Sequence, residues 1–182
     1  MSRILIIYTS IEGQTARIAG HMAQTLQQLG HSVDSRRVET ARPGLAFEQY
    51  DGVIAGASIH YGHHPAYFLA LVRSQRQALE GRPSAFFSVS LSGGGPGARP
   101  KTAQRYIAKF QRKTGWHPPQ VASIGGALQY SKYAAWKKWI MTKIVGVAGG
   151  DVDTSRDYEY TDWDAVAGFA RDFSKRLEPS AG

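Results

Sequence analysis

The chain of 182 residues contains no cysteine and no long apolar run. The missing cysteine excludes disulfides, thiolate metal ligands and a cysteine nucleophile, and it favours the cytoplasm as the compartment. No stretch approaches the roughly 18 uninterrupted apolar residues that a bilayer-spanning helix needs. Met1-Ser2-Arg3 runs directly into a strand-like segment, so we expect no signal peptide.

Acidic residues are missing from Gly81 to Gly150, although the chain has an ordinary charged content of 20%. The net charge is +8 and the pI is about 9.8. The same stretch holds Arg82, Arg99, Lys101, Arg105, Lys109, Arg112, Lys113, Lys132, Lys137, Lys138 and Lys143. One region therefore carries a positive potential that suits nucleic acid, an anionic membrane or an acidic small molecule. We expect no nucleic-acid partner, because no basic-aromatic ladder or known binding motif is present.

Hydrophobic periodicity predicts an α/β fold. Apolar runs without alternation predict strands buried on both faces at Arg3–Thr9, Asp51–Ala57, Ser84–Leu91 and Gln120–Leu128, and alternation predicts an outer strand at Ser32–Val38. Helical spacing predicts helices over Gln14–Leu29, Pro65–Leu79, Lys101–Lys113 and Trp163–Leu177. Alternating strands and helices favour a doubly wound parallel sheet, with the five strands in the order 2-1-3-4-5.

A long connection interrupts this pattern. We expect a single domain over residues 1–182, with an insert at about residues 129–162 that follows the first half of the last strand. A connection of that length in a compact domain is usually functional.

The turn after the first strand reads Ser10-Ile11-Glu12-Gly13-Gln14-Thr15. In this fold, ligands bind at the carboxyl ends of the strands, and the amides and dipole of the following helix favour an anion there. The turn has no Lys or Arg, and the chain has no GxxxxGK[ST] motif, so a phosphate monoester fits better than a triphosphate. A plain helix cap at Ser10 with a turn glycine is the alternative.

Two further loops follow the next strands at the same edge. Ser58, His60, Tyr61 and Gly62 end one strand, and the segment Ser88-Val89-Ser90-Leu91 ends the next. A flavin ring needs an aromatic cover, which Tyr61 suits, and hydroxyl or amide groups at its polar edge. His60, His63 and His64 have no carboxylate nearby in the sequence, so we expect no metal site.

The blocks Ser10–Thr15 (SIEGQT), Gly56–His63 (GASIHYGH) and Tyr160–Trp163 (YTDW) resemble the quinone-dependent, oxygen-independent protoporphyrinogen IX dehydrogenases. The segment from Gly125 to Trp163 looks like their long insert. The resemblance implies a flavodoxin-like fold with bound flavin mononucleotide (FMN). The expected cofactor-binding residues are Ser10, Ile11, Glu12, Gly13, Gln14, Thr15, Ser58, His60, Tyr61, Gly62, Ser88, Val89, Ser90, Leu91 and Asp153.

The resemblance also implies an enzymatic activity and a location in the cell. Such enzymes oxidise protoporphyrinogen IX in haem biosynthesis, pass the electrons to a membrane quinone, menaquinone or ubiquinone, and lie on the cytoplasmic face of the bacterial inner membrane as peripheral proteins. His60 and His63 are the candidate catalytic residues near the ring.

Aromatic and basic residues of the insert suit a substrate or an anionic membrane surface: Tyr133, Trp136, Lys137, Lys138, Trp139 and Lys143. An apolar stripe at helical spacing runs through Trp136, Trp139, Ile140, Ile144 and Val147. The alternative is an amphipathic helix that packs its apolar face on the sheet.

Two other functions are open for the same fold. A flavodoxin-like NAD(P)H:quinone reductase would take electrons from a nicotinamide, and an electron-transfer flavoprotein would have no substrate of its own. Such carriers are usually acidic, whereas this chain is basic. We also leave a homo-oligomer open.

Overall fold

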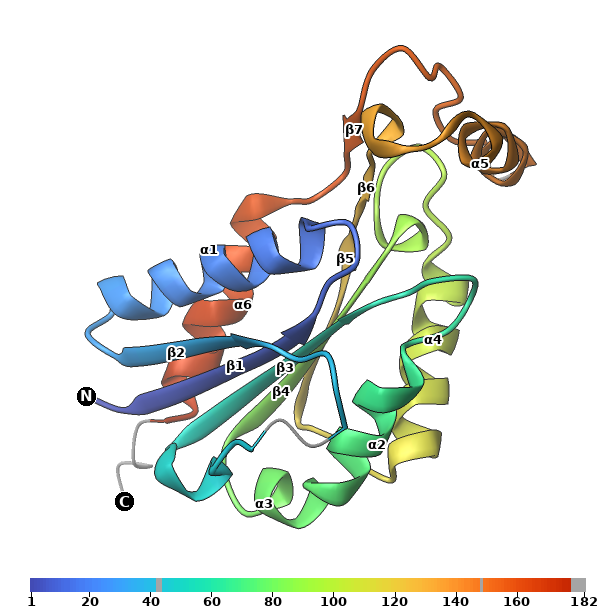
Figure 1. The fold of residues 1–182 in the computed structure, drawn as a ribbon. Helices are drawn as coiled ribbons and strands as arrows, with labels where there is room; N and C mark the ends of the chain where they lie inside the picture. The colour runs from blue at the N-terminus through green and yellow to red at the C-terminus, as the bar shows by residue number, and fades with distance from the viewer. Residues whose placement is uncertain (42–43, 148, 178–182) are drawn as a thin grey trace.

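The structure, a computed structural model, describes residues 1–41, 44–147 and 149–177. Five parallel strands form the central sheet in the order β2-β1-β3-β4-β5 (Figure 1). They are β1 (Arg3–Thr9), β2 (Ser32–Arg37), β3 (Gly52–Ser58), β4 (Ser84–Ser90) and β5 (Gln120–Gly125). The predicted sheet and its strand order are confirmed.

Helices cover both faces of the sheet (Figure 1). On one face α1 (Gln14–Gln28) and α6 (Trp163–Lys175) pack on Ile4 and Ile6 of β1. On the other face α2 (Ala66–Ser74), α3 (Arg76–Glu80) and α4 (Pro100–Thr114) pack on Leu5 and Ile7. Successive side chains of a strand point to opposite faces, so β1 contributes to both cores. This explains its apolar run without alternation.

The predicted helix over Pro65–Leu79 is two helices in the structure. It is interrupted at Gln75, which ends α2 with φ −101° and ψ 11°. The Ser74 hydroxyl donates to the Leu71 carbonyl at 2.8 Å, a local bond that competes with regular helix geometry. The short 3₁₀ helices η1 (Phe47–Gln49), η2 (Leu91–Gly93) and η3 (Tyr130–Lys132) complete the helical segments.

The last predicted strand is also divided. β5 ends at Gly125, and the chain continues as β6 (Ala127–Leu128), which pairs antiparallel with β7 (Tyr158–Glu159) in a separate sheet. The Tyr160 amide donates to the Gly126 carbonyl at 3.0 Å. A Cβ at Gly125 would lie 2.2 Å from the Tyr160 carbonyl oxygen. Gly125 therefore lets the return of the insert cross the end of β5 in close contact.

The insert has a small core of its own. Leu128, Tyr130, Tyr133 and Val145 are buried together, and the last of these belongs to α5 (Ala135–Val147). Among the described residues, no helix is both long and apolar enough to cross a membrane.

His64 is a buried polar residue of the core beneath α2 and α4. Its Nε2 lies 2.9 Å from the Ser88 hydroxyl, and its ring packs edge-on against Phe86 and Phe110. Burial, assisted by the nearby Lys109 ammonium, lowers the pKa of His64 to about 4. The imidazole is therefore uncharged in the folded protein at neutral pH.

This burial predicts a loss of stability in mild acid. Between pH 6.5 and pH 4 the unfolded chain binds a proton at His64 that the folded chain does not, so the free energy of unfolding falls as the pH falls. From pH 7 to pH 5 the loss from this residue is about 2 kcal/mol. Urea denaturation at the two pH values measures it.

The matched control is His64→Gln, which keeps a polar side chain but cannot titrate. Its stability should fall by about 2 kcal/mol less than that of the unmodified chain over the same pH interval. An equal fall in both proteins would show that His64 is not the group responsible.

Candidate functional site

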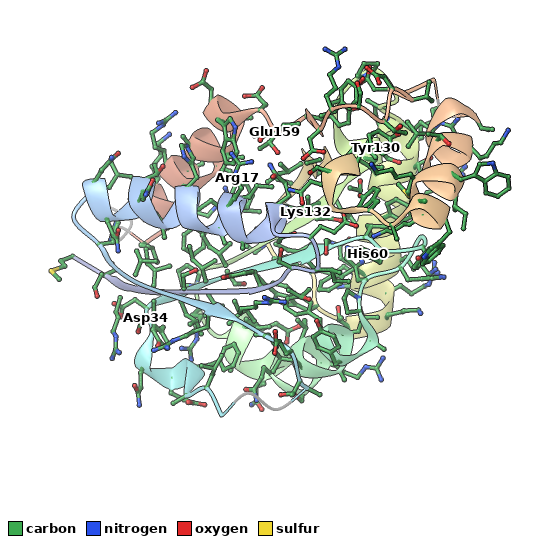
Figure 2. The ribbon with its side chains drawn as sticks, turned by 45° about the horizontal axis from the view of Figure 1, so that its top comes forward. Arg17, Asp34, His60, Tyr130, Lys132 and Glu159 are labelled. Atoms are coloured by element: carbon green, nitrogen blue, oxygen red, sulfur yellow. The ribbon has the colours of Figure 1, made fainter. Side chains whose placement is uncertain are left out.

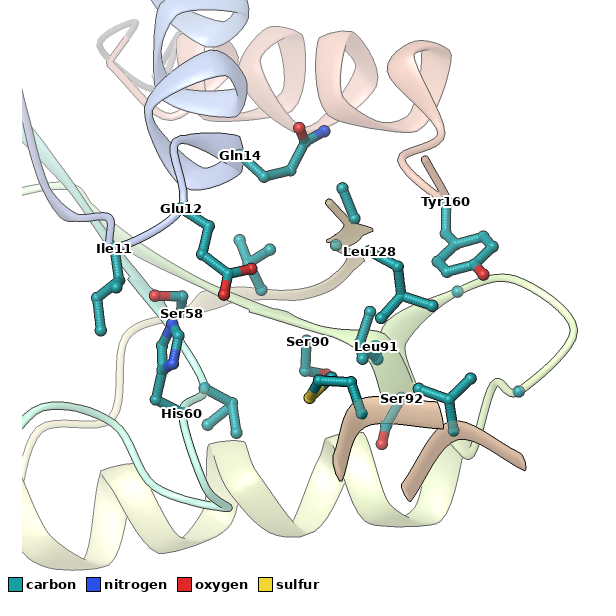
Figure 3. Close-up of a pocket in the computed structure, with 18 of the residues that line it drawn as sticks. Ile11, Glu12, Gln14, Ser58, His60, Ser90, Leu91, Ser92, Leu128 and Tyr160 are labelled. Atoms are coloured by element: carbon teal, nitrogen blue, oxygen red, sulfur yellow. The ribbon is translucent and has the colours of Figure 1, made fainter. Parts of the chain in front are cut away.

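A cavity of about 340 Å³ lies at the carboxyl ends of the strands. Its walls come from the turn after β1, the loops after β3 and β4, the first two turns of α4, and the insert. Figure 3 shows side chains from these segments converging on the space between α1, the insert and α4. Segments far apart in the chain therefore form one site.

The turn Ser10–Thr15 forms one end of the cavity. Gly13 adopts φ 100°, a left-handed conformation open to glycine, and α1 begins at the next residue. The Ser10 hydroxyl oxygen accepts from the amides of Gly13 at 3.1 Å and Ala16 at 3.4 Å. Gly13 is the N-cap residue of α1, so Ser10 supports the first turn from outside the helix, and the turn directs the start of α1 toward the cavity. Ser10, Ile11, Glu12, Gln14 and Thr15 line it.

The loop after β3 closes as a tight turn at its tip. The backbones of His60 and His63 exchange hydrogen bonds of 2.9 and 3.0 Å, with Tyr61 and Gly62 between them at positive φ. Tyr61 is 77% exposed and stands at the rim of the cavity. A non-glycine residue at positive φ is uncommon, and such residues gather at functional sites.

The two candidate catalytic histidines lie in different places. His60 lines the cavity, and burial lowers its pKa against the opposing effect of the Glu12 carboxylate (Figure 3). His63 lies outside it, with its Nδ1 2.8 Å from the Lys109 ammonium nitrogen. Of the two, His60 is the one in a position to reach a ligand.

Two buried hydroxyls in the wall have no hydrogen-bond partner. They are Ser58 Oγ at the end of β3 and Ser90 Oγ at the end of β4. A buried polar atom without a partner costs about 1–3 kcal/mol, so such atoms mark a position for a ligand or water. Neutral hydroxyls over an anion-binding turn suit a flavin, with its polar ring edge and its phosphate.

Two of the predicted cofactor residues, Ser88 and Asp153, direct their side chains elsewhere. Val89 and Leu91 line the cavity, whereas Ser88 points to the opposite side of β4, toward His64. Asp153 does not line the cavity: its carboxylate accepts from the amide and hydroxyl of Ser155 and pairs with Arg156. The structure gives these two side chains a role in the core and in a turn of the insert.

The insert forms the roof of the cavity. One side of α5 and the segment before it lines the space with Tyr133, Lys137, Met141 and Val145. Trp136 and Trp139 are 63% and 65% exposed and face away from it, and Lys138 and Lys143 do not line it. Because Trp136 and Trp139 are exposed, the predicted apolar stripe does not pack on the sheet. The side chain of Ile144, which also belongs to the stripe, lies outside the described part of the chain.

Sequence reasoning missed part of the wall. Arg99, Thr102 and Tyr106 reach it from the start of α4, and Gly94 and Gly97 from the loop before that helix. Thr102 and Tyr106 are four residues apart, which places both on one face of a helix, and this spacing was the available signal. Gly94 permits close packing, because a Cβ there would lie 2.7 Å from the Tyr160 carbonyl oxygen.

A metal site was not expected. Among residues 1–41, 44–147 and 149–177, no group of three or more His, Asp and Glu side chains is arranged to hold a metal ion.

Comparison with known proteins identifies the fold of the chain. A flavodoxin domain model matches residues 5–155. The structure of oxidised flavodoxin 1 from Bacillus cereus superposes with a TM-score of 0.56, at 18% identity over 97% of this chain and 100% of that one, and shows a shared fold. A flavoprotein in complex with FMN from Lactobacillus acidophilus gives a TM-score of 0.51, at 13% identity over 68% of this chain and 93% of that one.

Curated relatives are closer in sequence. Protoporphyrinogen IX dehydrogenase [quinone] of Escherichia coli K12 is 36% identical over 172 residues, which are 94% of each chain. The protein of the same name from Leishmania major is 34% identical over 94% of this chain and 74% of its own length. The chain therefore belongs to the quinone-dependent protoporphyrinogen IX dehydrogenase family of flavodoxin-domain proteins.

Proposed function

We propose that this chain binds FMN and oxidises protoporphyrinogen IX to protoporphyrin IX, passing the electrons to a membrane quinone in haem biosynthesis. The observation that carries the proposal is the turn Ser10–Thr15, an anion site without Lys or Arg that opens on a cavity roofed by the insert. The relatives named for this reaction support the choice of substrate.

FMN is the flavin that the residues suit. A monophosphate matches an anion site built from backbone amides and the hydroxyls of Ser10 and Thr15. The unpartnered hydroxyls of Ser58 and Ser90 would then meet the polar edge of the ring. When bound, FMN would supply the redox chemistry, and the protein would position the reactants and handle the proton.

We propose that His60 accepts the proton that the substrate releases during oxidation. Its lowered pKa leaves the ring uncharged at neutral pH, so a ring nitrogen can accept the proton that a pyrrole N–H of the substrate loses. The rest of the cavity suits a tetrapyrrole: Met141 and Val145 provide an apolar wall, and Arg99 provides a cation for a propionate.

We assign the outer side of the insert to the anionic surface of the inner membrane, on its cytoplasmic face. Apart from Met1 and Leu29, the exposed large apolar side chains of the described residues belong to loops that line the cavity or to the insert. They are Ile11, Tyr61, Trp136, Trp139, Val147 and Val152. Lys138 and Lys143 add positive charge to the same helix. Tryptophan beside lysine is favourable at a lipid interface, where the quinone is dissolved.

The first prediction on function concerns the phosphate. Thr15→Val should weaken FMN binding by about tenfold or more, because a hydrogen bond to a charged group contributes about 1.5–3 kcal/mol. Titration of flavin fluorescence against the apoprotein measures it. Thr25→Val, the same change on α1 away from the cavity, should leave the affinity unchanged; equal weakening in both would show an effect on the helix rather than on the phosphate.

The second prediction concerns turnover. Under anaerobic conditions, the FMN-loaded protein should convert protoporphyrinogen IX to fluorescent porphyrin when a menaquinone analogue is supplied. His60→Gln should slow this by at least about a hundredfold, the usual contribution of a proton-transfer group, while the exposed His117→Gln should not. No fluorescence with flavin bound, together with reduction of that flavin by NADPH, would favour an NAD(P)H:quinone reductase instead.

The third prediction concerns the membrane. Replacing Trp136 and Trp139 together by Gln should weaken co-sedimentation with anionic phospholipid vesicles by about tenfold or more, since two interfacial aromatic anchors are lost. Leu29→Gln removes an exposed apolar side chain at the other end of the molecule and serves as control. Unchanged binding of the double variant would remove the insert from the membrane contact.

A further inference from the structure

The Glu12 carboxylate joins the anion-binding turn to the insert. Lys137 Nζ donates to Glu12 Oε1 at 2.7 Å, and the Tyr133 hydroxyl donates to Glu12 Oε2 at 2.7 Å. The partners are more than 120 residues away in the chain. Figure 3 shows the Glu12 carboxylate directed into the cavity.

This bridge is partly removed from water. The Lys137 and Glu12 side chains are 27% and 22% exposed, and Tyr133 is buried. The Lys137 ammonium also lies 4.1 Å from the centroid of the Tyr133 ring. Burial and the adjacent carboxylate raise the pKa of Tyr133, which keeps its hydroxyl a donor. Charges in such a place interact more strongly than those of an open surface pair.

The position of Glu12 poses an electrostatic problem for an anion site. The turn Ser10–Thr15 contains no basic residue, and its charged side chain is this carboxylate. A phosphate on the turn would be repelled by an uncompensated negative charge so close to it. The compensating charge comes from the insert: Lys137 pairs with the carboxylate itself, and Lys132 Nζ donates to the Glu12 backbone carbonyl at 3.4 Å. The turn alone is therefore an incomplete phosphate site.

We propose that Lys137 and Tyr133 are positioning residues for the flavin: by holding and neutralising the Glu12 carboxylate, they make tight binding of the phosphate depend on the insert lying closed over the cavity. This inference rests on the proposed binding of FMN. By linkage, the bound phosphate must favour the closed insert by the same factor.

Other contacts hold the insert independently of this bridge. Arg17 of α1 pairs with Glu159 of β7, and the two lie side by side in Figure 2. An Arg99 guanidinium nitrogen donates to the Val147 carbonyl at 3.0 Å, at the other end of α5. The insert also has its own buried core. Removing the Lys137 charge should therefore leave the insert folded.

The test uses the full chain as apoprotein, with FMN and riboflavin as probes. Lys137→Met should weaken FMN binding by about tenfold, because it exposes the phosphate to the Glu12 charge, and riboflavin binding by less than about twofold, because riboflavin has no phosphate. Glu12→Gln should bind FMN at least as tightly as the unmodified chain. Adding Glu12→Gln to Lys137→Met should restore the affinity. Lys175→Met, which breaks an exposed ion pair with Asp172, is the matched control.

A second readout follows the insert itself. In the unmodified chain, FMN should slow amide hydrogen exchange over residues 129–147 more than riboflavin does, and in Lys137→Met this difference should disappear. Unchanged FMN affinity in Lys137→Met, equal weakening of FMN and riboflavin, or weakened FMN binding in Glu12→Gln would each overturn the proposal. If the unmodified chain binds no FMN, the proposed function fails with it.

Discussion

The central constraint on this molecule is a parallel sheet that is covered on both faces. Side chains of β1, β3 and β4 are taken up by two cores, one beneath α1 and α6 and one beneath α2 and α4. Ligand chemistry is therefore left to the loops at the carboxyl edge, where three strands end beside one another. The cavity, its unpartnered serine hydroxyls and the left-handed Gly13 and Tyr61 all belong to that edge.

The insert changes what this edge can do. It leaves the sheet at Gly125, where a side chain would collide with the returning backbone at Tyr160. Its inner side closes the cavity, and its outer side presents aromatic and basic residues to the surroundings. One helix, α5, thus lies between the cavity and a surface on which Trp136 and Trp139 are exposed. The proposed reaction between a tetrapyrrole and a lipid-dissolved quinone would use both sides of this helix.

Charge is arranged in the same two-sided way. The acid-free stretch from Gly81 to Gly150 provides Arg99 and Lys137 at the cavity and Lys138 and Lys143 on the outside of the insert. At Glu12 a carboxylate from outside that stretch meets Lys137 at 2.7 Å. The local balance of charge at the anion-binding turn therefore depends on two segments that are distant in the chain.

The sequence by itself determined the sheet, its strand order and the glycine turn before α1, because apolar periodicity and turn residues act over a few neighbouring positions. The depth of a residue along its strand could not be predicted in the same way: Ser88 and Ser90 lie two residues apart on β4, but Ser90 at the carboxyl end lines the cavity, whereas Ser88 meets the buried His64. The tertiary structure alone separated His60 from His63, placed Asp153 away from the cavity, and brought Lys137 to Glu12. These outcomes depend on how distant segments pack, which no local pattern records.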